Sequence, residues 1–346
     1  MRLLDETNLA DYLRDTGRIG PNESVVVREL SGGVSNVVYS VSCPDVPDRD
    51  FVLKQAREQL RTTAAWFCTV ERIWREIDVL QVCAELLERT PTEPLVAVTP
   101  RVLFEDRENF CFAMTAAPMN HRVWKRDLLE GRVDLDIGAA CGKLLGKLHA
   151  GSWLDPKIAR ELGDRTIFDE LRTDPFYRTV ARAYPDLEQP IGRLIDSVRQ
   201  HAICLVHADF SPKNLLVFEG GLMMVDFETG HFGDPAFDLG FFLSHLALKA
   251  FRHRPHDRPY WELSKKFLSE YQRELRAVVA PLDLQLLMRR AMQNFGGCVL
   301  SRLAGKSPVN YLDEPVRREQ LVRLCRWCFL ERPDGWSEVC AVIAPT

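Results

Sequence analysis

Hydrophobic and polar positions alternate with a period of two in three segments near the start of the chain: SVVVREL, VSNVVYSV and FVLKQ. Turn residues separate these segments, which lie between residues 24 and 55. Such alternation is typical of β-strands that bury one face. The segments VTPRVLFED and NFCFAMT, between residues 98 and 115, add two further candidates. We therefore predict five strands in the first third of the chain.

The pattern changes at residue 59, where apolar residues begin to recur at spacings of three and four. This period predicts one long amphipathic helix over residues 59–89. Its apolar positions are Phe67, Val70, Ile73, Trp74, Ile77, Leu80, Ala84 and Leu87.

Helical periodicity also dominates the chain after residue 120. One predicted helix starts at a well-marked point, with Asp234 as the N-cap and Pro235 at the first helical position. The other predicted helices cover residues 135–151, 260–280, 283–304 and about 314–330.

These elements predict an α+β, bilobal protein. Residues 1–117 would form a small antiparallel-sheet lobe with one long helix, and residues 118–346 a larger, mainly helical lobe. Pro118 in the segment AAPMN interrupts the strand pattern at the boundary. The length of 346 residues agrees with this division, because it exceeds what one ordinary hydrophobic core supports.

Charge and composition exclude several classes of protein. The net charge of −4 gives no reason to expect nucleic acid as a partner, and no apolar run approaches the roughly 18 residues of a membrane span. The first residues, MRLLDETNLADYL, lack the basic-then-apolar order of a secretory signal. We expect a cytoplasmic protein with no membrane contact and no obligatory protein partner.

The ten cysteines are scattered through apolar segments, where cysteine behaves as a small hydrophobic residue. Cys325 and Cys328 form one Cys-x-x-Cys pair inside a helical pattern, but no second pair follows. Because structural zinc sites need four ligands, a metal or redox role for this pair is not the favoured interpretation.

The most informative segment is a predicted hairpin with polar side chains at its ends. Two apolar strands, 215–218 and 222–225, are joined by a Glu-Gly-Gly turn. Asp209 and Asn214 precede the first strand, and Asp226 follows the second. A tight hairpin brings these ends together, so the three side chains can converge. Such oxygen ligands suit Mg²⁺, which takes one or two carboxylates together with phosphate oxygens.

Lys54 ends an apolar strand, where a lysine is either solvated or paired, since an unpaired buried charge is costly. The predicted helix 59–89 offers two acidic partners. Glu76 lies at the border of the apolar stripe, whereas Glu71 precedes Arg75 by four positions and is better explained as a surface pair. We predict the pair Lys54–Glu76.

The segment LSGGVSNVVY is open to two interpretations. It is either a hairpin turn or a loop whose backbone N–H groups face a phosphate, with Ser31, Ser35 and Asn36 as additional donors. It is not a P-loop, because no Gly-Lys-Ser/Thr follows.

Taken together, these segments resemble a known superfamily. HADFSPKN matches a His-x-Asp-x-x-x-x-Asn catalytic loop, and VDFETG with GDPAFDLG resembles the metal-binding turn and helix of the aminoglycoside phosphotransferase and choline kinase-like superfamily. Its members are small-molecule kinases with a protein-kinase-like fold. The resemblance extends to LSGGVSNVVY, FVLK and REIDVL and covers roughly residues 25–245.

The resemblance implies a role for each matching position. Asp209 would be the catalytic base that orients the acceptor hydroxyl, and Asn214 and Asp226 would hold Mg²⁺ against the nucleotide phosphates. Lys54 would contact the α- and β-phosphates and be fixed by Glu76. Phosphoryl transfer asks mainly for positioning and charge neutralisation, which this division of roles provides.

Further roles concern the nucleotide and the support of the loop. The expected triphosphate cover consists of Ser31, Gly32, Gly33, Ser35 and Asn36. Met114 and Thr115, in the connector ending at Pro118, would line the adenine pocket. His207 and Asp238, which the family pairs with each other, would be structural supports for Asp209. Lys213 is expected to be solvated, because Ser211 occupies the position of the protein-kinase catalytic-loop lysine.

The predicted function is an ATP- and Mg²⁺-dependent phosphotransferase, with GTP as an alternative donor. The acceptor would be a hydroxyl group of a small molecule: a sugar, an amino alcohol, a nucleoside-like metabolite or an aminoglycoside. Only residues 229–234 separate Glu228 from the next helix, which leaves no room for a peptide platform. The alternatives are a catalytically silent nucleotide-binding regulator and a metal-dependent phosphohydrolase.

The C-terminal region bears on the acceptor. From residue 249 onward there are 17 Lys and Arg against 11 Asp and Glu, which weighs against a polycationic acceptor and favours a neutral or anionic one. The basic segment FRHRPHDRP can equally be a solvated loop. Arg302, Lys306 and Tyr311 could face the cleft, but the sequence offers no physical argument that they do.

Overall fold

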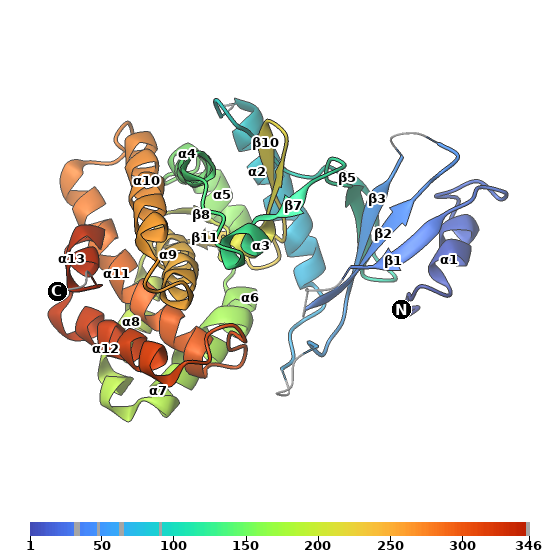
Figure 1. The fold of residues 1–346 in the computed structure, drawn as a ribbon. Coiled ribbons are helices and arrows are strands. Elements are labelled where there is room, and N and C mark those ends of the chain that lie inside the picture. The colour runs from blue at the N-terminus through green and yellow to red at the C-terminus, as the bar shows by residue number, and fades with distance from the viewer. Residues whose placement is uncertain (31–34, 47–48, 62–65, 90–91, 344–346) are drawn as a thin grey trace.

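The computed structural model describes residues 1–30, 35–46, 49–61, 66–89 and 92–343, and it has two lobes (Figure 1). A lobe rich in β-strands carries the N-terminus, and a larger lobe of helices carries the C-terminal elements. This arrangement confirms the predicted α+β, bilobal fold.

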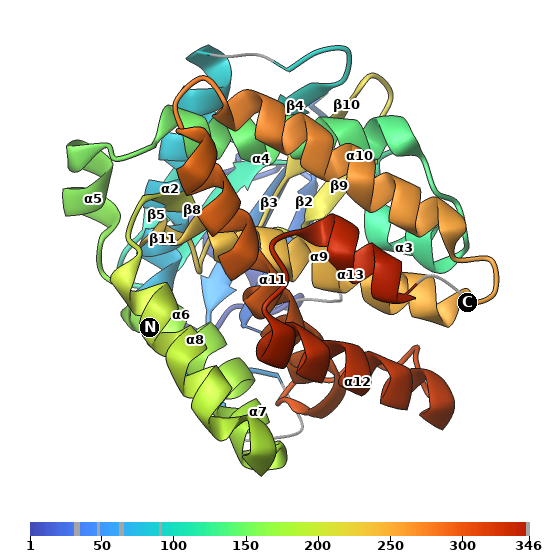
Figure 2. The same cartoon turned by 90° about the vertical axis from the view of Figure 1, so that its left-hand side faces the viewer.

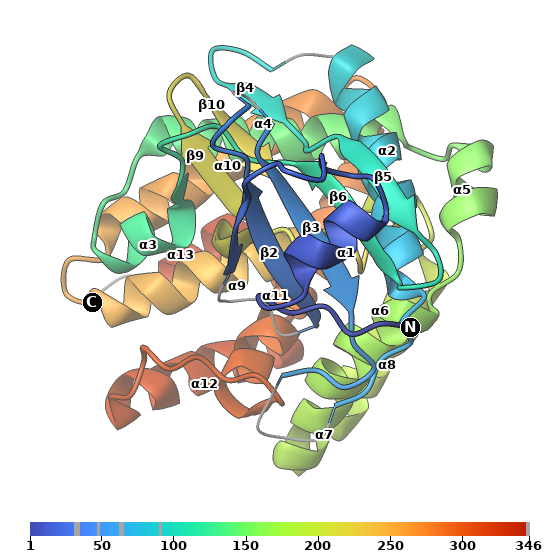
Figure 3. The ribbon, with the colours of Figure 1, turned by 90° about the vertical axis from the view of Figure 1, so that its right-hand side faces the viewer.

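The first sheet has five antiparallel strands in the order β1-β2-β3-β6-β5, and they coincide with the five predicted segments. Leu9 and Leu13 of helix α1 are buried on one face of this sheet, in a cluster with Val37 and Leu53 (Figure 3). The seven-residue helix α1 was not predicted, because so short a segment shows no clear period. The bounds are α1 (Leu9–Asp15), β1 (Val26–Glu29), β2 (Asn36–Ser42), β3 (Phe51–Ala56), β5 (Val102–Asp106) and β6 (Cys111–Thr115).

Helix α2 (Arg72–Arg89) packs on β3 and on a helix of the larger lobe. The prediction that it begins at residue 59 is wrong, because the described residues before Arg72 are not helical. There, Trp66 Nε1 donates a hydrogen bond to the carbonyl oxygen of Glu170 (3.0 Å), and the Thr69 backbone N–H donates to the Glu170 carboxylate (3.1 Å). These contacts with the other lobe compete with a longer helix, a tertiary effect that local periodicity does not reveal.

A second sheet, in the order β4-β10-β9-β7, contains the predicted hairpin β9–β10. Gly220 in the turn has a φ of +77°, a left-handed conformation that glycine adopts without strain. Strand β4 pairs in parallel with β10, so the first 117 residues contribute one strand to this sheet. A third, two-stranded sheet pairs β8 with β11. The bounds are β4 (Val96–Val98), β7 (Arg122–Val123), β8 (Cys204–Val206), β9 (Leu215–Phe218), β10 (Gly221–Met224) and β11 (His231–Gly233).

The larger lobe is built around α9 (Pro235–Arg252), in which every residue from Pro235 to Phe251 is buried (Figure 2). As predicted, Asp234 caps this helix, accepting a hydrogen bond from the Ala236 N–H (3.1 Å). Asp234 also pairs with Arg290 (3.0 Å), so capping is not its only role.

The helices around α9 include the other predicted ones. The predicted segments 135–151, 260–280, 283–304 and 314–330 correspond to α4, α10, α11 and α12. None of the helices in the described part of the chain combines the length and the apolarity that crossing a bilayer requires. The bounds are α3 (Trp124–Leu129), α4 (Leu135–Gly151), α5 (Pro156–Leu162), α6 (Thr166–Phe168), the π-helix η1 (Asp169–Arg178), α7 (Thr179–Ala183), η2 (Pro185–Leu187), α8 (Glu188–Gln200), η3 (Pro212–Asn214), α10 (Arg258–Leu275), α11 (Pro281–Ala304), α12 (Pro315–Glu331) and α13 (Trp336–Ile343).

Candidate active site

The loop between β8 and β9 is fixed by Asp238, in the first turn of α9. The Asp238 carboxylate accepts hydrogen bonds from the backbone N–H groups of His207 (2.8 Å) and Ala208 (2.7 Å) and lies 3.2 Å from His149 Nε2. Ala208 has a φ of +57°, a strained conformation for alanine, which these bonds help to hold. The resemblance pairs Asp238 with His207; here the contact is to the backbone of His207, and the paired ring belongs to His149.

His207 holds the same loop from within. Its Nδ1 accepts a hydrogen bond from the Asp209 backbone N–H (3.2 Å), and burial lowers the pKa of the ring, so His207 is neutral at neutral pH. For Asp238, burial alone would raise the pKa, but the hydrogen bond from His149 brings it below its usual value. A neutral histidine and an ionised carboxylate therefore set the position of Asp209.

Three side chains converge on the Asp209 carboxylate. Asn214 Nδ2 donates a hydrogen bond to Oδ2 at 2.8 Å, Lys213 Nζ lies 2.8 Å from Oδ2, and Arg172 Nη2 lies 3.0 Å from Oδ1. Lys213 was expected to be solvated; its side chain is partly exposed, and the contact with Asp209 was not predicted. Lys213 Nζ also lies 3.9 Å from Asp226 Oδ2, so one ammonium group stands between both carboxylates. The predicted convergence of Asp209, Asn214 and Asp226 is present.

Arg172 was not predicted as a site residue. It lies in the π-helix η1, which contains Pro175, and this segment has no helical or strand period in the sequence. Its guanidinium also donates to the carbonyl oxygen of Ala208 (2.8 Å). Arg172 thus contacts both the side chain of Asp209 and the strained residue before it.

A buried ion-pair network lies on the side of the five-stranded sheet. Lys54 Nζ is 2.5 Å from Glu76 Oε1, as predicted, and 3.1 Å from Asp226 Oδ1. Burial would lower the pKa of Lys54, but the charges of Asp226 and Glu76 raise it above its usual value. Burial also raises the pKa of Glu76 to about 7, against the effect of Lys54. The Lys54 ammonium is therefore charged and bridges the two acidic groups.

Glu228, two residues after Asp226, links this network to the start of β2. Its carboxylate accepts hydrogen bonds from Ser35 Oγ and from Asn36 Nδ2 (3.0 Å), and pairs with Arg72 Nε (3.2 Å). Ser35 and Asn36 were predicted as phosphate donors, and in this structure both bind Glu228. Neither Glu228 nor Arg72 was predicted as a site residue, although Glu228 lies within the motif VDFETG.

The remaining predicted site residues are those expected to contact the nucleotide. Ser31, Gly32 and Gly33 lie outside the described residues. Met114 and Thr115 are the last residues of β6, and the Thr115 backbone N–H donates to the carbonyl oxygen of Arg101 (2.9 Å).

The predicted metal ligands offer oxygen donors. Burial would raise the pKa of Asp226, but Lys54 and Lys213 lower it below the usual value, so the carboxylate is ionised. The backbone of Asn214 lies beside that of Asp226, because the backbone carbonyl oxygen of Asn214 accepts a hydrogen bond from the backbone N–H of Val225 (3.0 Å). No group of three or more His, Cys, Asp or Glu side chains gathers as a metal cage in the described ranges. The donor set therefore fits Mg²⁺ that takes its other ligands from phosphate and water.

The Cys325–Cys328 pair lies buried on α12. Burial raises the pKa of the Cys325 thiol well above its usual value and that of Cys328 to about 12. Both are therefore protonated thiols, which disfavours metal binding or redox chemistry.

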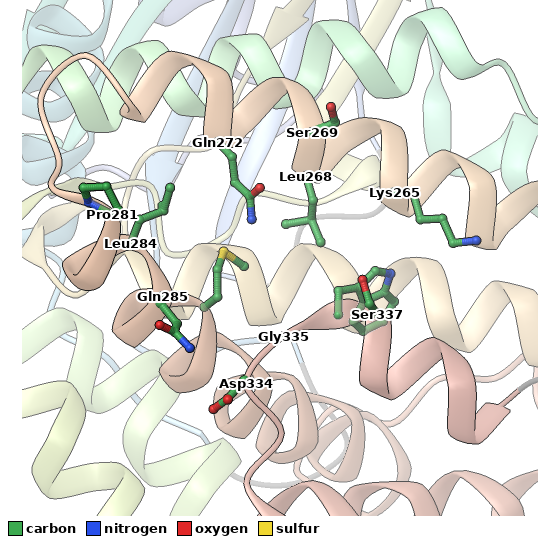
Figure 4. A pocket seen from close by; sticks show the side chains of 12 residues that line it. Lys265, Leu268, Ser269, Gln272, Pro281, Leu284, Gln285, Asp334, Gly335 and Ser337 are labelled. Carbon is green, nitrogen blue, oxygen red and sulfur yellow. The ribbon is translucent and has the colours of Figure 1, made fainter.

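A hollow of about 440 Å³ lies elsewhere, between α10, α11 and the start of α13 (Figure 4). Leu268, Gln272 and Met288 are among its lining residues, and none of the catalytic-loop or ion-pair residues described above contributes to it. It is therefore separate from the candidate active site.

The chain is similar to known proteins over most of its length. Residues 26–274 match the model of a family described as the phosphotransferase enzyme family. A methylthioribose kinase of Erwinia tasmaniensis is 26% identical over 284 residues, which cover 71% of this chain and 66% of the relative. The chain thus spans just under two thirds of that relative's length.

Two solved structures share the fold. A choline kinase from Cryptosporidium parvum Iowa II superposes with a TM-score of 0.54 at 12% identity, covering 95% of each chain. An amicoumacin kinase in complex with AMP-PNP and Ca²⁺ superposes with a TM-score of 0.52 at 15% identity, covering 96% of this chain and 98% of the other. At these identities the likeness is one of fold.

Proposed function

The chain belongs to the phosphotransferase enzyme family, and we propose that it transfers the γ-phosphoryl group of ATP, bound with Mg²⁺, to a hydroxyl group of a small molecule. The observation that carries this proposal is the convergence of Asp209 and Asp226 on one ammonium group, that of Lys213. Two acids with separate partners supply the two needs of phosphoryl transfer, a group that orients the acceptor and a group that holds the metal.

The roles of the side chains follow from their contacts. Asp209, held by Arg172 and Asn214, would accept a hydrogen bond from the acceptor hydroxyl and then take its proton. Asp226 and Asn214 would hold Mg²⁺, which neutralises phosphate charge when bound. Lys54 would exchange its contact with Asp226 for the nucleotide phosphates while Glu76 keeps it in place. Proton transfer, metal binding and phosphate binding thus use different side chains.

Lys213 contributes charge rather than proton transfer. Its ammonium lies between the two carboxylates and is partly exposed, so it can neutralise charge on the transferred phosphoryl group. GTP is an alternative donor for the same site.

The short connection after the metal-binding turn supports a small acceptor. Glu228 is followed by β11 and then directly by α9, so no segment is available as a platform for a peptide. The methylthioribose kinase relatives and the choline and amicoumacin kinase structures carry small-molecule substrates in their names, which agrees with this size class.

Product analysis tests the proposal. The protein is incubated with ATP and Mg²⁺ and a panel of sugars, nucleosides, amino alcohols, hydroxy acids and aminoglycosides, with Asp209→Asn as the blank. We expect ADP and a phosphorylated acceptor in equal amounts. Phosphate released to water from every mixture would indicate a phosphohydrolase, and tight nucleotide binding without turnover of any acceptor would indicate a regulator.

Metal-dependent binding tests the assignment of Asp226 without relying on turnover. Isothermal titration should show Mg²⁺-dependent ATP binding that Asp226→Ala abolishes and that Asp186→Ala, a change of a surface-paired acid on the larger lobe, leaves intact. Full Mg²⁺·ATP affinity in Asp226→Ala would contradict the assignment.

A further inference from the structure

A group of cationic side chains without acidic partners extends away from Asp209, and Arg302 in it lies within electrostatic range of that carboxylate. We call it the cationic cluster; it consists of Lys125 on α3, His245 and Lys249 on α9, Arg302 on α11 and Tyr311 in the following loop. None of Lys125, Lys249 and Arg302 has a carboxylate within 4.0 Å among the described residues, whereas Asp209 already has two cations of its own. Positive charge is therefore in excess on this side of the catalytic loop.

Side-chain contacts connect the cluster to Asp209 along one face of α9. Arg172, which pairs with Asp209, has its guanidinium carbon 5.6 Å from the ring centre of Phe241. Phe241 and His245 follow one another by one turn, with ring centres 4.8 Å apart. Lys249, one turn further, donates to the carbonyl oxygen of His245 (3.0 Å). Because a helix rises about 1.5 Å per residue, this row places Lys249 about 12 Å along α9 from Phe241.

Tyr311, Arg302 and Lys125, the other members of the cluster, lie near Lys249. Lys249 Nζ lies 5.7 Å from the ring centre of Tyr311, and Arg302 and Lys125 are close enough for their charges to lower the pKa of Lys249. Lys125 is next to Trp124, whose ring stacks on Phe242 of α9 at 6.0 Å. Four elements, α3, α9, α11 and the loop after it, thus direct polar groups to one region.

Polar atoms of the cluster are buried without a partner. Arg302 Nε, Tyr311 Oη and His245 Nε2 are buried atoms that make no hydrogen bond within the structure as described. Lys249 is fully buried, and among the residues that the structure describes its one hydrogen-bond acceptor is a carbonyl oxygen of its own helix. Buried polar groups are paired in most folded proteins, so several orphans at one place indicate a missing binding partner.

The electrostatics agree with an absent anion. Burial lowers the pKa of Lys249 well below its usual value, and the charges of Lys125 and Arg302 lower it further. Burial and the charges of Lys249, Arg302, Lys213 and Lys125 likewise lower the pKa of His245. The members of the cluster repel one another, and a bound negative charge would relieve this repulsion.

We propose that the cationic cluster binds an anionic group of the acceptor, so that the substrate is a hydroxylated small molecule carrying a carboxylate or a phosphate. This inference rests on the proposed function, because it places the acceptor beside Asp209. Arg302 and Lys249 would supply the charge and Tyr311 a neutral donor, while Asp209 receives the hydroxyl. The surrounding charge disfavours choline-like and polycationic acceptors, which require acidic or aromatic sites.

Matched pairs of acceptors test this assignment. Each pair contains a hydroxy acid and its neutral amide, or a sugar phosphate and its neutral sugar, so the carboxylate and phosphate arms also separate the two sources of charge. For the preferred arm we expect kcat/KM to be about 10- to 100-fold higher for the anionic member. Arg302→Met should remove most of this preference and leave KM for ATP unchanged, and Arg326→Met, a surface arginine on α12, should change neither.

Binding of a simple anion tests the cluster without catalysis. Inorganic sulfate, titrated at constant ionic strength and followed by thermal stability, should stabilise the native protein and the control Lys265→Met, but neither Arg302→Met nor Lys249→Met. Equal protection of all four proteins, or preference for the neutral acceptors, would overturn the inference. A rise of KM for ATP in Arg302→Met would assign the cluster to the nucleotide. ATP turnover with no acceptor would contradict the proposed function, while the sulfate titration would still decide whether the cluster binds anions.

Discussion

Two buried groups of charged side chains flank the catalytic loop, and they differ in balance. On the side of the five-stranded sheet, Lys54 and Arg72 face Glu76, Asp226 and Glu228, and each charge has a partner of opposite sign. In the cationic cluster, Lys125, Lys249 and Arg302 have no carboxylate within 4.0 Å among the described residues. The first group is complete without a ligand, whereas the second is not. A buried charge that the protein itself does not neutralise indicates what the ligand must bring.

The largest expected effect concerns Asp209, which lies where the two groups meet. Asp209→Asn removes the proposed base and should lower kcat by about 10²- to 10⁴-fold, while Mg²⁺·ATP affinity stays within about threefold. Steady-state kinetics and nucleotide titration measure these quantities, with Asp186→Asn on the surface as the control. A kcat within twofold of the native value would show that Asp209 is not the base.

The second prediction compares the two fully enclosed lysines by the same substitution. Lys54→Met leaves Glu76 buried without its partner, so the free energy of unfolding should fall by about 3–5 kcal/mol. Lys249→Met removes a buried charge that has no acidic partner and should raise the free energy of unfolding by about 1–3 kcal/mol. Urea unfolding measures both. If Lys249→Met were as destabilising as Lys54→Met, the proposed difference between the two groups would be wrong.

The third prediction concerns the support of the catalytic loop. Asp238→Asn replaces an ionised acceptor of two backbone N–H groups, and the free energy of unfolding should fall by about 1.5–3 kcal/mol, with a loss of kcat as the loop loses its position. Asp155→Asn is a matched control, because Asp155 also accepts two backbone N–H groups but asparagine caps a helix equally well. Equal effects of the two changes on stability and kcat would argue against a special role for Asp238.

The smallest expected effect is a pH dependence from His245. Burial and the charges of Lys249 (α9), Arg302 (α11), Lys213 (η3) and Lys125 (α3) lower the pKa of this histidine well below 6.5 in the folded protein. Below pH 6.5 the unfolded chain therefore binds a proton that the folded protein does not. As the pH is lowered, the free energy of unfolding should decrease by up to about 1.4 kcal/mol per pH unit. His245→Gln should remove this component, and His256→Gln, at an exposed position, should not. Urea unfolding between pH 5 and 8 measures the slopes; identical slopes in the native protein and His245→Gln would contradict the prediction.

Residues whose role follows from local pattern could be predicted from the sequence. The five strands, the hairpin and helices α4 and α9–α12 follow from periodicity and turn residues. The Lys54–Glu76 pair and the meeting of Asp209 with Asp226 follow from their places at strand ends and on a helix border. The first contact joins a strand to the helix that follows it in the chain, and the second joins the two ends of one hairpin, so elements that are consecutive in sequence decide both.

Other contacts depend on distant parts of the chain and were missed. Arg172 lies in a π-helix without a sequence period, and its approach to Asp209 is decided by packing of that segment. The contact of Lys213 with Asp209 was missed, because it depends on the geometry of the turn η3, whereas the prediction considered only that Ser211 takes the position of the protein-kinase lysine. The cationic cluster joins α3, α9 and α11, whose proximity no local pattern reveals. Lys249 did give a signal, since a lysine within the almost uniformly apolar α9 is bound to be buried.

Strand β4 has a mechanical consequence. The chain leaves the smaller lobe to form the three residues of β4, which pair in parallel with β10 of the hairpin that precedes Asp226. It then returns to the five-stranded sheet as β5. This pairing connects the two lobes along one edge, which would act as a hinge. If the five-stranded sheet rotated over a bound nucleotide, Lys54 would move with the sheet, whereas Asp226 would stay close to the hinge.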